Sequence, residues 1–465
     1  MSPPATDFAT LPLAPHVLAN LAQLGYERMT PVQAATLPLA LAGKDLIAQA
    51  KTGSGKTAAF ALPLLARLNP RRFAVQGLVL VPTRELADQV AQELRRLARA
   101  EDNLKVVTLS GGVPLRAQSA SLAHGAHAVV GTPGRVLDHL RRESLLIDAV
   151  GTLVLDEADR MLDMGFAEDI ASVIQQCPKD RQTLLFSATY PEGVGKLAAK
   201  FMREPQQVTL TERHAASKIR QRFYEVKETE RLHAVGLLLN HYRPQSTLAF
   251  CNTKQQCRDL TAVLQAEGFA ALELHGDLEQ RDRDQVLVQF ANRSASVLVA
   301  TDVAARGLDI ANLEAVINVE ITPDAEMHTH RIGRTGRADE EGWAFSLASL
   351  DEMGYVGRID AMQGSESVWH QLSELTPVIT QDSAEPLRPP MVTLQIMGGR
   401  KEKIRAGDVL GALTKDLGLT FEQVGKINVN DFSTYVAVEC SVADKALRGL
   451  NAGRVKGKSV KVRAL

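Results

Sequence analysis

Short apolar runs alternate with helical stretches along the first part of the chain. The runs lie at 45–50, 77–82, 105–110, 128–131, 152–159 and 183–189. The stretch 84–100 is typical of the helical segments between them. Because parallel strands are buried on both faces, they are expected to be apolar almost throughout and to alternate with crossover helices. The pattern therefore predicts an α/β domain with a parallel sheet.

A second series of apolar runs follows a polar stretch, residues 203–218, which we interpret as a linker. The new runs lie at 246–253, 270–276, 296–302, 315–320 and 343–349. The prediction is two tandem α/β domains and a small third domain, with boundaries at 1–207, 219–375 and 391–465 and linkers at 208–218 and 376–390.

Composition is that of an ordinary globular protein, with 45% hydrophobic and 23% charged residues in 465. The N-terminal MSPPATDFATLPL has no basic stretch before an apolar core, so no signal peptide is expected. No uncharged apolar run approaches the roughly 20 residues of a membrane span. The four cysteines show neither metal-ligand nor disulfide spacing. We therefore expect a protein of the reducing cytoplasm that does not bind membranes.

The net charge of −1 conceals an asymmetry along the chain. Residues 388–465 carry 14 Lys and Arg against 7 Asp and Glu, which leaves −8 on the preceding part. A basic tail on a mildly acidic body indicates an anionic partner for the tail, although a solvated surface would show the same charge.

The sequence AKTGSGKT follows one apolar run and opens a helical stretch. Gly53 and Gly55 allow backbone N–H groups to approach phosphate oxygens, Lys56 can neutralise the β- and γ-phosphates, and Thr57 can ligate Mg²⁺. Ala50 replaces the first glycine of the general motif. The predicted ATP-binding residues of this loop are Ala50, Lys51, Thr52, Gly53, Ser54, Gly55, Lys56 and Thr57.

A second apolar run ends on adjacent carboxylates in VLDEADRMLDMGF. Acidic residues suit a helix N-terminus, and they also suit a metal ion. Beside a phosphate loop, an Asp at the end of such a strand supports Mg²⁺ and a neighbouring Glu polarises the attacking water. We assign these roles to Asp156 and Glu157, while the helix-start interpretation stays open for Asp159 and Asp163.

Arginines at three-residue spacing occur in HRIGRTGR, residues 330–337. On a helix, Arg331, Arg334 and Arg337 would share one face. A solvated basic helix is the ordinary explanation. The alternative is an arginine finger, which accelerates phosphoryl transfer by about 10³–10⁵ and would require the two α/β domains to close together.

With these motifs in order, residues 1–375 resemble the DEAD-box RNA helicases, whose core consists of two RecA-like domains. The resemblance implies that Phe8 stacks on adenine, Gln33 reads its edge and Asp309 contacts the ribose. It assigns Arg334 and Arg337 to the γ-phosphate and SAT, residues 187–189, to coupling. The implied coupling residues are Ser187, Ala188 and Thr189, and the implied RNA contacts are Pro82, Thr83, Arg84, Gly111, Gly112, Thr132, Pro133, Gly134, Arg135, Arg283 and Thr301.

The basic tail resembles the RRM-like domain of the bacterial DbpA subgroup. That resemblance implies large-subunit ribosomal RNA and 50S precursors as partners, with Lys401, Lys403 and Arg405 as contacts. An ordinary RRM stacks bases on aromatic residues of its central strands. Here Gln395 and Ser433 occupy stacking positions and only Tyr435 remains, so we expect binding through basic loops. A tail that only raises general RNA affinity stays an alternative.

The predicted function is an RNA-dependent ATPase that uses ATP and Mg²⁺ to unwind short RNA duplexes locally. Two alternatives remain open: an RNA chaperone or clamp that hydrolysis only resets, and a DNA helicase or translocase.

Overall fold

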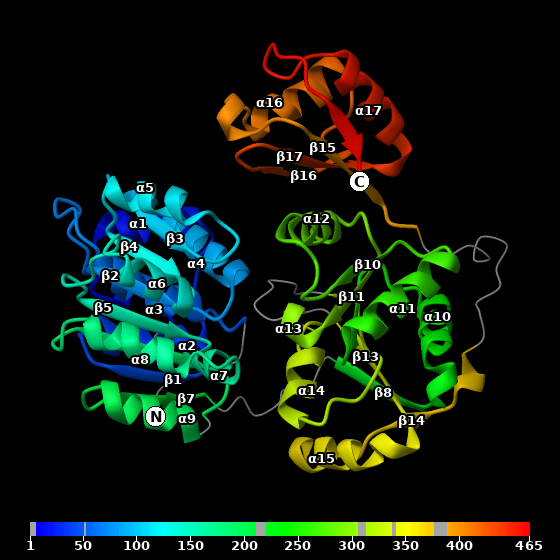
Figure 1. The fold of residues 1–465 in the computed structure, drawn as a ribbon, viewed down its shortest axis with the longest axis horizontal. Helices are drawn as coiled ribbons and strands as arrows, with labels where there is room; N and C mark the ends of the chain where they lie inside the picture. Colours follow the sequence, from blue (N-terminus) through cyan, green and yellow to red (C-terminus); the bar gives the residue numbers. More distant parts are fainter. Residues whose placement is uncertain are drawn as a thin grey trace. The chain divides into compact units, whose positions relative to one another are not determined.

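The computed structural model describes residues 6–50, 53–190, 192–210, 219–305, 313–336, 341–375 and 388–465. These residues form two compact units, one before residue 211 and one after residue 218 (Figure 1). None of the helices in the described ranges combines the length and the apolar character that a bilayer span requires.

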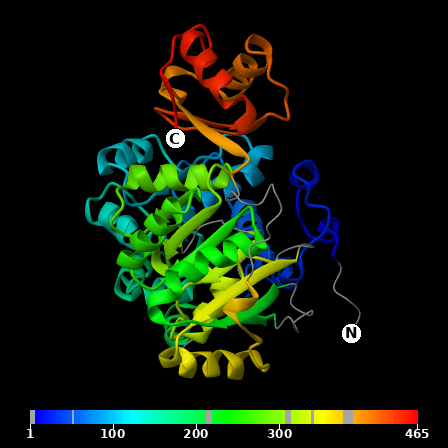
Figure 2. The same ribbon diagram turned by 90° about the vertical axis from the view of Figure 1, so that its right-hand side faces the viewer.

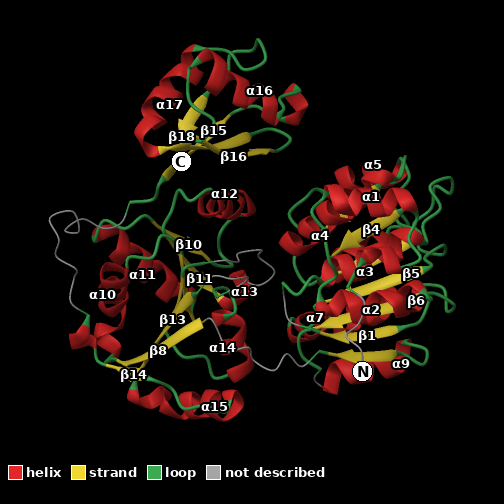
Figure 3. Cartoon of the chain, turned by 180° about the vertical axis from the view of Figure 1, so that it is seen from behind, coloured by secondary structure: helices red, strands yellow, loops and turns green. Residues whose placement is uncertain are grey.

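The first unit is built on a parallel sheet of seven strands in the order β3-β4-β2-β5-β6-β1-β7 (Figure 3). Its strands are β1 Leu46–Gln49, β2 Gly77–Leu80, β3 Val106–Leu109, β4 Ala128–Gly131, β5 Thr152–Asp156, β6 Gln182–Ser187 and β7 Gln206–Thr209. Its helices are α1 Pro15–Gln23, α2 Pro31–Leu41, α3 Lys56–Ala66, α4 Arg84–Leu97, α5 Leu115–Ala123, α6 Pro133–Arg141, α7 Ala158–Asp163, α8 Ala167–Gln176 and α9 Glu192–Phe201.

Two hydrophobic clusters cover the two faces of this sheet. One includes Phe60 of α3 and Phe186 of β6, and the other includes Leu155 of β5 and Ile170 of α8. Every residue of β2, β4, β5 and β6 is buried. This double burial explains why these strands appear in the sequence as unbroken apolar runs.

One strand at the edge of this sheet was not predicted from the sequence. Strand β7 lies inside the polar stretch 203–218 that we interpreted as a linker, and it pairs with β1 through Leu46 and Gln206. Three of its four residues are exposed and the fourth is half-buried. An edge strand needs no continuous apolar run, so the sequence pattern gave no sign of it.

The second unit contains another parallel seven-stranded sheet, in the order β10-β11-β9-β12-β13-β8-β14. Counted from its own first strand, this order is identical to that of the first sheet. Its strands are β8 Ile219–Glu225, β9 Thr247–Cys251, β10 Ala271–Leu274, β11 Val297–Thr301, β12 Ala315–Asn318, β13 Gly342–Ala348 and β14 Trp369–His370. Its helices are α10 Arg231–Tyr242, α11 Lys254–Ala266, α12 Gln280–Ala291, α13 Asp302–Ala305, α14 Ala325–Ile332 and α15 Met353–Gln363. The predicted pair of RecA-like parallel-sheet domains is confirmed.

A smaller antiparallel sheet, ordered β16-β17-β15-β18, forms the C-terminal part of the second unit. Its strands are β15 Met391–Ile396, β16 Val424–Val429, β17 Thr434–Glu439 and β18 Val462–Ala464. The helices α16 Ala406–Gly411 and α17 Ala443–Ala452 lie on one side of it (Figures 1 and 2). Leu394, Leu413, Val436 and Leu450 pack between the helices and the sheet. The predicted small α+β domain is confirmed.

Candidate active site

The phosphate loop connects β1 with α3, and its backbone geometry explains its glycines. Gly53 and Gly55 have φ values of 82° and 93°, in the left-handed region that other residues adopt only with strain. A Cβ on Gly55 would lie 2.6 Å from Gln33 Nε2 and 2.9 Å from Thr30 Oγ1. A side chain therefore does not fit at residue 55. The predicted contacts Lys51 and Thr52 lie outside the described residues.

Lys56 is the first residue of α3 and is buried, with 6% of its surface exposed. Its ammonium group has no hydrogen-bond partner among the described residues. A buried charge is costly unless a partner compensates it. The site therefore fits an anionic ligand, and the position at the start of a helix suits phosphate.

Asp156 and Glu157 lie where β5 meets α7. Asp156 accepts the backbone N–H of Glu157 at 3.0 Å. Burial raises the pKa of Asp156 to about 6, although the positive charge of Lys56 opposes the rise. The two charges are thus close enough to interact, as a shared phosphate–metal site requires.

Glu157 adopts left-handed backbone geometry, with φ at 53°. Its Oε2 accepts a hydrogen bond from Arg160 Nη1 at 2.9 Å, and both side chains are almost fully buried. An ion pair between neighbours on one helical turn fixes the direction of the carboxylate. Arg160 is a positioning residue for Glu157 that we did not predict from the sequence.

The residues present fit ATP with Mg²⁺. Among the described residues no group of three or more His, Cys, Asp or Glu could hold a metal alone. Mg²⁺ in nucleotide sites uses one or two protein ligands and completes its shell with phosphates and water. Asp156, beside the unpartnered Lys56, and the half-buried Thr57 satisfy that pattern.

Asp159 joins α7 to the SAT segment after β6. Its Oδ2 accepts the N–H groups of Ala188 and Thr189, at 3.1 and 2.8 Å, and the hydroxyl of Thr189 at 2.9 Å. Its own N–H donates to Ser187 Oγ at 3.2 Å. Burial alone would raise the pKa of Asp159, but the bonds from Thr189 outweigh it and hold the pKa below its usual value. Asp163 is the last residue of α7, so the helix-start interpretation is wrong for it.

One of the two predicted adenine contacts, Gln33, lies beside the phosphate loop. Gln33 forms a capping box with Thr30 at the start of α2, and its Nε2 donates to Gly55 O at 3.1 Å. The ring of Phe8 is 4% exposed and packs edge to face on Tyr26, with 6.1 Å between ring centroids. The adenine contacts stay predictions.

The predicted RNA-backbone residues of the first unit follow three neighbouring strands. Residues 82–84 come after β2, 111–112 after β3 and 132–135 after β4, which lie side by side in the sheet. Because the strands are parallel, these loops share one edge of the sheet. Arg135 donates to Val113 O and Gln118 Oε1, which ties the third loop to the second.

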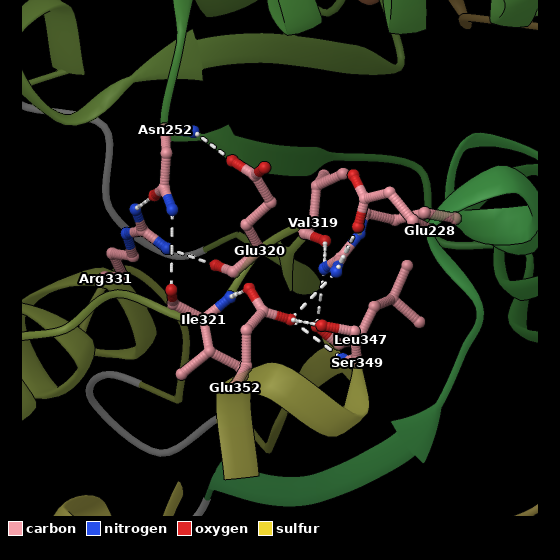
Figure 4. A network of polar contacts seen from close by, with 10 residues as sticks. Glu228, Asn252, Val319, Glu320, Ile321, Arg331, Leu347, Ser349 and Glu352 are labelled. Carbon is pink, nitrogen blue, oxygen red and sulfur yellow. Dashed lines mark hydrogen bonds and ion pairs between the residues drawn. The ribbon is translucent and has the colours of Figure 1, made fainter. Parts of the chain in front are cut away.

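The second unit overturns the prediction of one helical arginine face. Helix α14 ends at Ile332, before Arg334, and Gly333 is its C-cap. Arg331 is 1% exposed and pairs with Asp302 at 2.7 Å. It also donates to Asn252 Oδ1 at 2.7 Å (Figure 4). Three-residue spacing places side chains on one face only while the helix continues.

The remaining residues predicted in the second unit are placed as follows. Thr301 is buried at the end of β11, and Arg283 of α12 donates to Ala304 O at 2.7 Å. Arg334 is buried, with 6% of its surface exposed. Asp309 and Arg337 lie outside the described residues.

In the C-terminal domain, Lys401, Lys403 and Arg405 are exposed in the loop between β15 and α16. Tyr435, in contrast, is 4% exposed, and its hydroxyl receives a hydrogen bond from Gln395 Nε2 at 3.1 Å. The expected loss of the stacking platform therefore extends to its one aromatic residue.

Comparison with known proteins gives one consistent result. The family model "DEAD/DEAH box helicase" matches residues 30–197, "Helicase conserved C-terminal domain" matches 229–339, and "DbpA RNA binding domain" matches 393–464. The chain is 51% identical over 461 residues to the ATP-dependent RNA helicase DbpA of Escherichia coli K12, covering 99% of this chain and 100% of the relative.

Two further similarities cover the helicase core. The DEAD-box ATP-dependent RNA helicase CshA of Bacillus cereus is 44% identical over 76% of this chain and 68% of its own length. The solved structure of S. cerevisiae Dbp5 bound to RNA and ADP BeF3 is similar with a TM-score of 0.73 and 30% identity, covering 80% of this chain and 97% of that one.

Proposed function

Because this chain belongs to the DEAD-box family of ATP-dependent RNA helicases and ends in a DbpA-type RNA-binding domain, we propose that it locally unwinds short duplexes in 23S ribosomal RNA during 50S assembly. The observation that carries its chemistry is Lys56, a buried cation close to Asp156 that finds no hydrogen-bond partner among the residues described. A general RNA chaperone or clamp without one ribosomal target is the second candidate.

When bound, ATP with Mg²⁺ supplies the γ-phosphoryl group and the charge that this site accommodates. Lys56 would neutralise the phosphates, Thr57 and Asp156 would hold the metal, and Glu157 would polarise the attacking water. Arg160 keeps the Glu157 carboxylate pointing in one direction. Arg334 and Arg337 belong to the other unit, so turnover requires both units to come together.

Coupling to RNA runs through Asp159 in this proposal. The carboxylate binds residues 188 and 189 directly and is only two residues from Glu157. A shift of the SAT segment on RNA binding would therefore be transmitted to α7, which carries the hydrolytic carboxylate. Contacts to RNA phosphates are independent of sequence, so the core alone selects no target.

Unwinding in this cycle is local. A base-pair step is worth roughly 1–2 kcal/mol, so distortion of one gripped strand suffices to melt a few pairs. Long processive unwinding is not expected from a protein that releases its strand after each hydrolysis.

Target choice is assigned to the tail. Support comes from its charge, with 14 Lys and Arg against 7 Asp and Glu. Further support comes from Tyr435, which is buried and so offers a splayed single strand no aromatic surface on the sheet. Basic loops favour the phosphates and shape of folded RNA. We place this activity in the cytoplasm, in keeping with four free cysteines.

The test is ATP turnover of the full chain with total ribosomal RNA, transfer RNA, poly(A) and DNA as separate activators. The proposal expects ribosomal RNA to stimulate most, and a matched Lys56→Ala chain to show no stimulated turnover. Equal stimulation by every RNA would favour the general chaperone, and stimulation by DNA alone would contradict an RNA helicase.

Strand release from a short RNA duplex separates unwinding from clamping. Wild-type chain should release the strand with ATP, and Lys56→Ala, which should not bind ATP, should not. Steady RNA-stimulated turnover without release would favour the clamp. Replacing Lys401, Lys403 and Arg405 together by alanine should abolish the preference for ribosomal RNA; full retention of it would place discrimination in residues 1–375.

A further inference from the structure

The tip of the β16–β17 hairpin carries an aromatic ring that packing does not explain. Asn430 donates its N–H to Ser433 O at 2.8 Å, so Asp431 and Phe432 form a two-residue turn. Such turns favour Gly, Asn and Asp. Phe432 is 72% exposed and gains little from burial. A residue that breaks the local preference without a packing gain marks a functional position.

The turn is fixed against the basic loop that follows β15. Arg400 donates its N–H to Asn430 O at 2.8 Å, and Lys401 donates to Asp431 O at 3.0 Å. A Cβ on Gly399 would lie 2.1 Å from Asn430 O, so the two backbones are in contact. Phe432 is therefore held directly beside two exposed cations.

A third loop completes this surface. Lys456 Nζ donates to Lys403 O, and Lys458 Nζ donates to Glu402 O at 3.2 Å. We call segments 400–405, 430–433 and 454–458 the basic rim. Seven exposed cations against Glu402 and Asp431 give it a net charge of +5. The cations are Arg400, Lys401, Lys403, Arg405, Arg454, Lys456 and Lys458.

The usual stacking positions of this fold are not available for a base. Gln395 and Tyr435 are 2% and 4% exposed. Arg463 Nε donates to Gln395 Oε1 at 2.7 Å, and Gln395 donates to the Tyr435 hydroxyl. This chain of internal hydrogen bonds occupies the sheet, whereas Phe432 presents its ring to solvent at the end of the hairpin.

We propose that Phe432 stacks on an unpaired base of a folded RNA while the basic rim holds the flanking phosphates. The inference rests on the proposed RNA-binding role of the tail and adds a base contact to it. An aromatic ring among cations is the combination that binds unstacked bases. A protein-docking surface would instead surround the ring with apolar residues and exclude charge from its centre.

The experiment uses the full chain and an RNA hairpin that carries 2-aminopurine in its loop, with the same stem as a blunt duplex for comparison. Phe432→Ala should weaken hairpin binding about tenfold, corresponding to roughly 1.4 kcal/mol, and should remove the change in 2-aminopurine fluorescence. Phe432→Trp should restore both, because tryptophan also offers a flat ring.

Phe421→Ala is the matched control. Phe421 is 69% exposed in the same domain but precedes β16, so the six-residue strand separates it from Phe432 by about 20 Å. Its substitution should leave affinity and fluorescence at wild-type values. Equal losses in both variants would overturn the proposal.

Salt dependence separates stacking from charge. Phe432→Ala should keep the slope of log affinity against log salt, whereas Lys401→Ala should lower it by about one unit. Unchanged hairpin binding in Phe432→Ala overturns the proposal and points to a protein partner for the ring. An equal loss of affinity for the hairpin and the blunt duplex also overturns it, because the ring would then contact no unpaired base. If the wild type binds no hairpin and ribosomal RNA does not stimulate turnover, the proposed function fails as well.

Discussion

In the first unit α3 begins with Lys56, in the second α10 begins with Arg231, and each helix follows the first strand of its own sheet. Both cations are buried. The ammonium group of Lys56 has no hydrogen-bond partner in the part of the chain that the structure describes. The guanidinium of Arg231 donates to Glu228, to Glu352 and to the carbonyls of Val319 and Leu347 (Figure 4).

The second unit thus supplies acceptors for its buried cation from its own residues, whereas the first unit leaves that position to a ligand. Val319 follows β12 and Leu347 lies in β13, the strands that correspond to β5 and β6 of the first sheet. Burial alone would lower the pKa of Arg231, but the hydrogen bonds that it donates to Glu352 and Glu228, together with their charges, raise the pKa above its usual value. At the start of the helix that follows the first strand, a buried cation indicates a nucleotide site only where the described residues of its own unit give it no hydrogen-bond partner.

The largest effect should come from an arginine that serves the opposite unit. Arg334→Ala, and likewise Arg337→Ala, should lower RNA-stimulated turnover by about 10³–10⁵ while RNA affinity stays near wild type, because the charge acts on the transition state. Turnover and RNA binding are measured on the same preparations. Equal losses of both would identify an RNA-phosphate contact instead.

A smaller effect on turnover separates the roles of Glu157 and Lys56 within the first unit. Glu157→Gln should retain ATP binding and lower turnover by about 10²–10⁴, because the amide cannot accept the proton of the attacking water. Lys56→Ala should lose ATP binding itself. Binding of a fluorescent nucleotide and single-turnover hydrolysis distinguish them; near wild-type single-turnover hydrolysis in Glu157→Gln would refute the assignment.

Next is a direct contrast between the two buried cations. Arg231→Met should lower the unfolding free energy of the second unit by about 3–5 kcal/mol, because the buried carboxylate of Glu352 loses its cationic partner. Lys56→Met removes a buried charge that has no hydrogen-bond partner among the described residues, so it should destabilise the first unit far less. Hydrogen exchange, read separately for each unit, measures both. Similar losses in the two variants would break the comparison.

The smallest effect concerns Asp156 and pH. Its pKa rises from 3.8 to about 6 on folding, so the folded chain binds the proton more tightly than the unfolded chain. Stability without nucleotide should therefore fall as pH rises from about 4 to about 6. Asp156→Asn should remove this fall and gain about 1–3 kcal/mol at neutral pH, while Mg²⁺-dependent hydrolysis is lost. Parallel stability–pH curves for the two chains would contradict this.

Features that are contiguous in sequence were predictable. The phosphate loop and the carboxylates after β5 each occupy a few neighbouring residues, and the central strands show as apolar runs because both faces are buried. The strands β7 and β8 were not predicted, because only Phe223 and Tyr224 in them are buried.

Contacts between distant segments could not be predicted from spacing. Thirty residues separate Asp159 from Thr189, and 121 separate Arg231 from Glu352. The prediction that the arginines of 331–337 share one helical face was wrong because α14 ends at Ile332, before Arg334. A local signal did exist for Phe432, an aromatic residue within a turn between two strands, but we considered only sheet positions for stacking.

The common strand order also bears on ancestry. Two sheets that repeat one non-sequential order within a single chain are what duplication of an ancestral domain produces, even where no sequence repeat survives. The first unit has a glycine loop before its cation, whereas the second has Glu228 and Glu352 around its own. The cation that opens α10 thus serves the fold of the second sheet, and the residues expected to act on the nucleotide from this unit, Asp309, Arg334 and Arg337, lie elsewhere in its sequence.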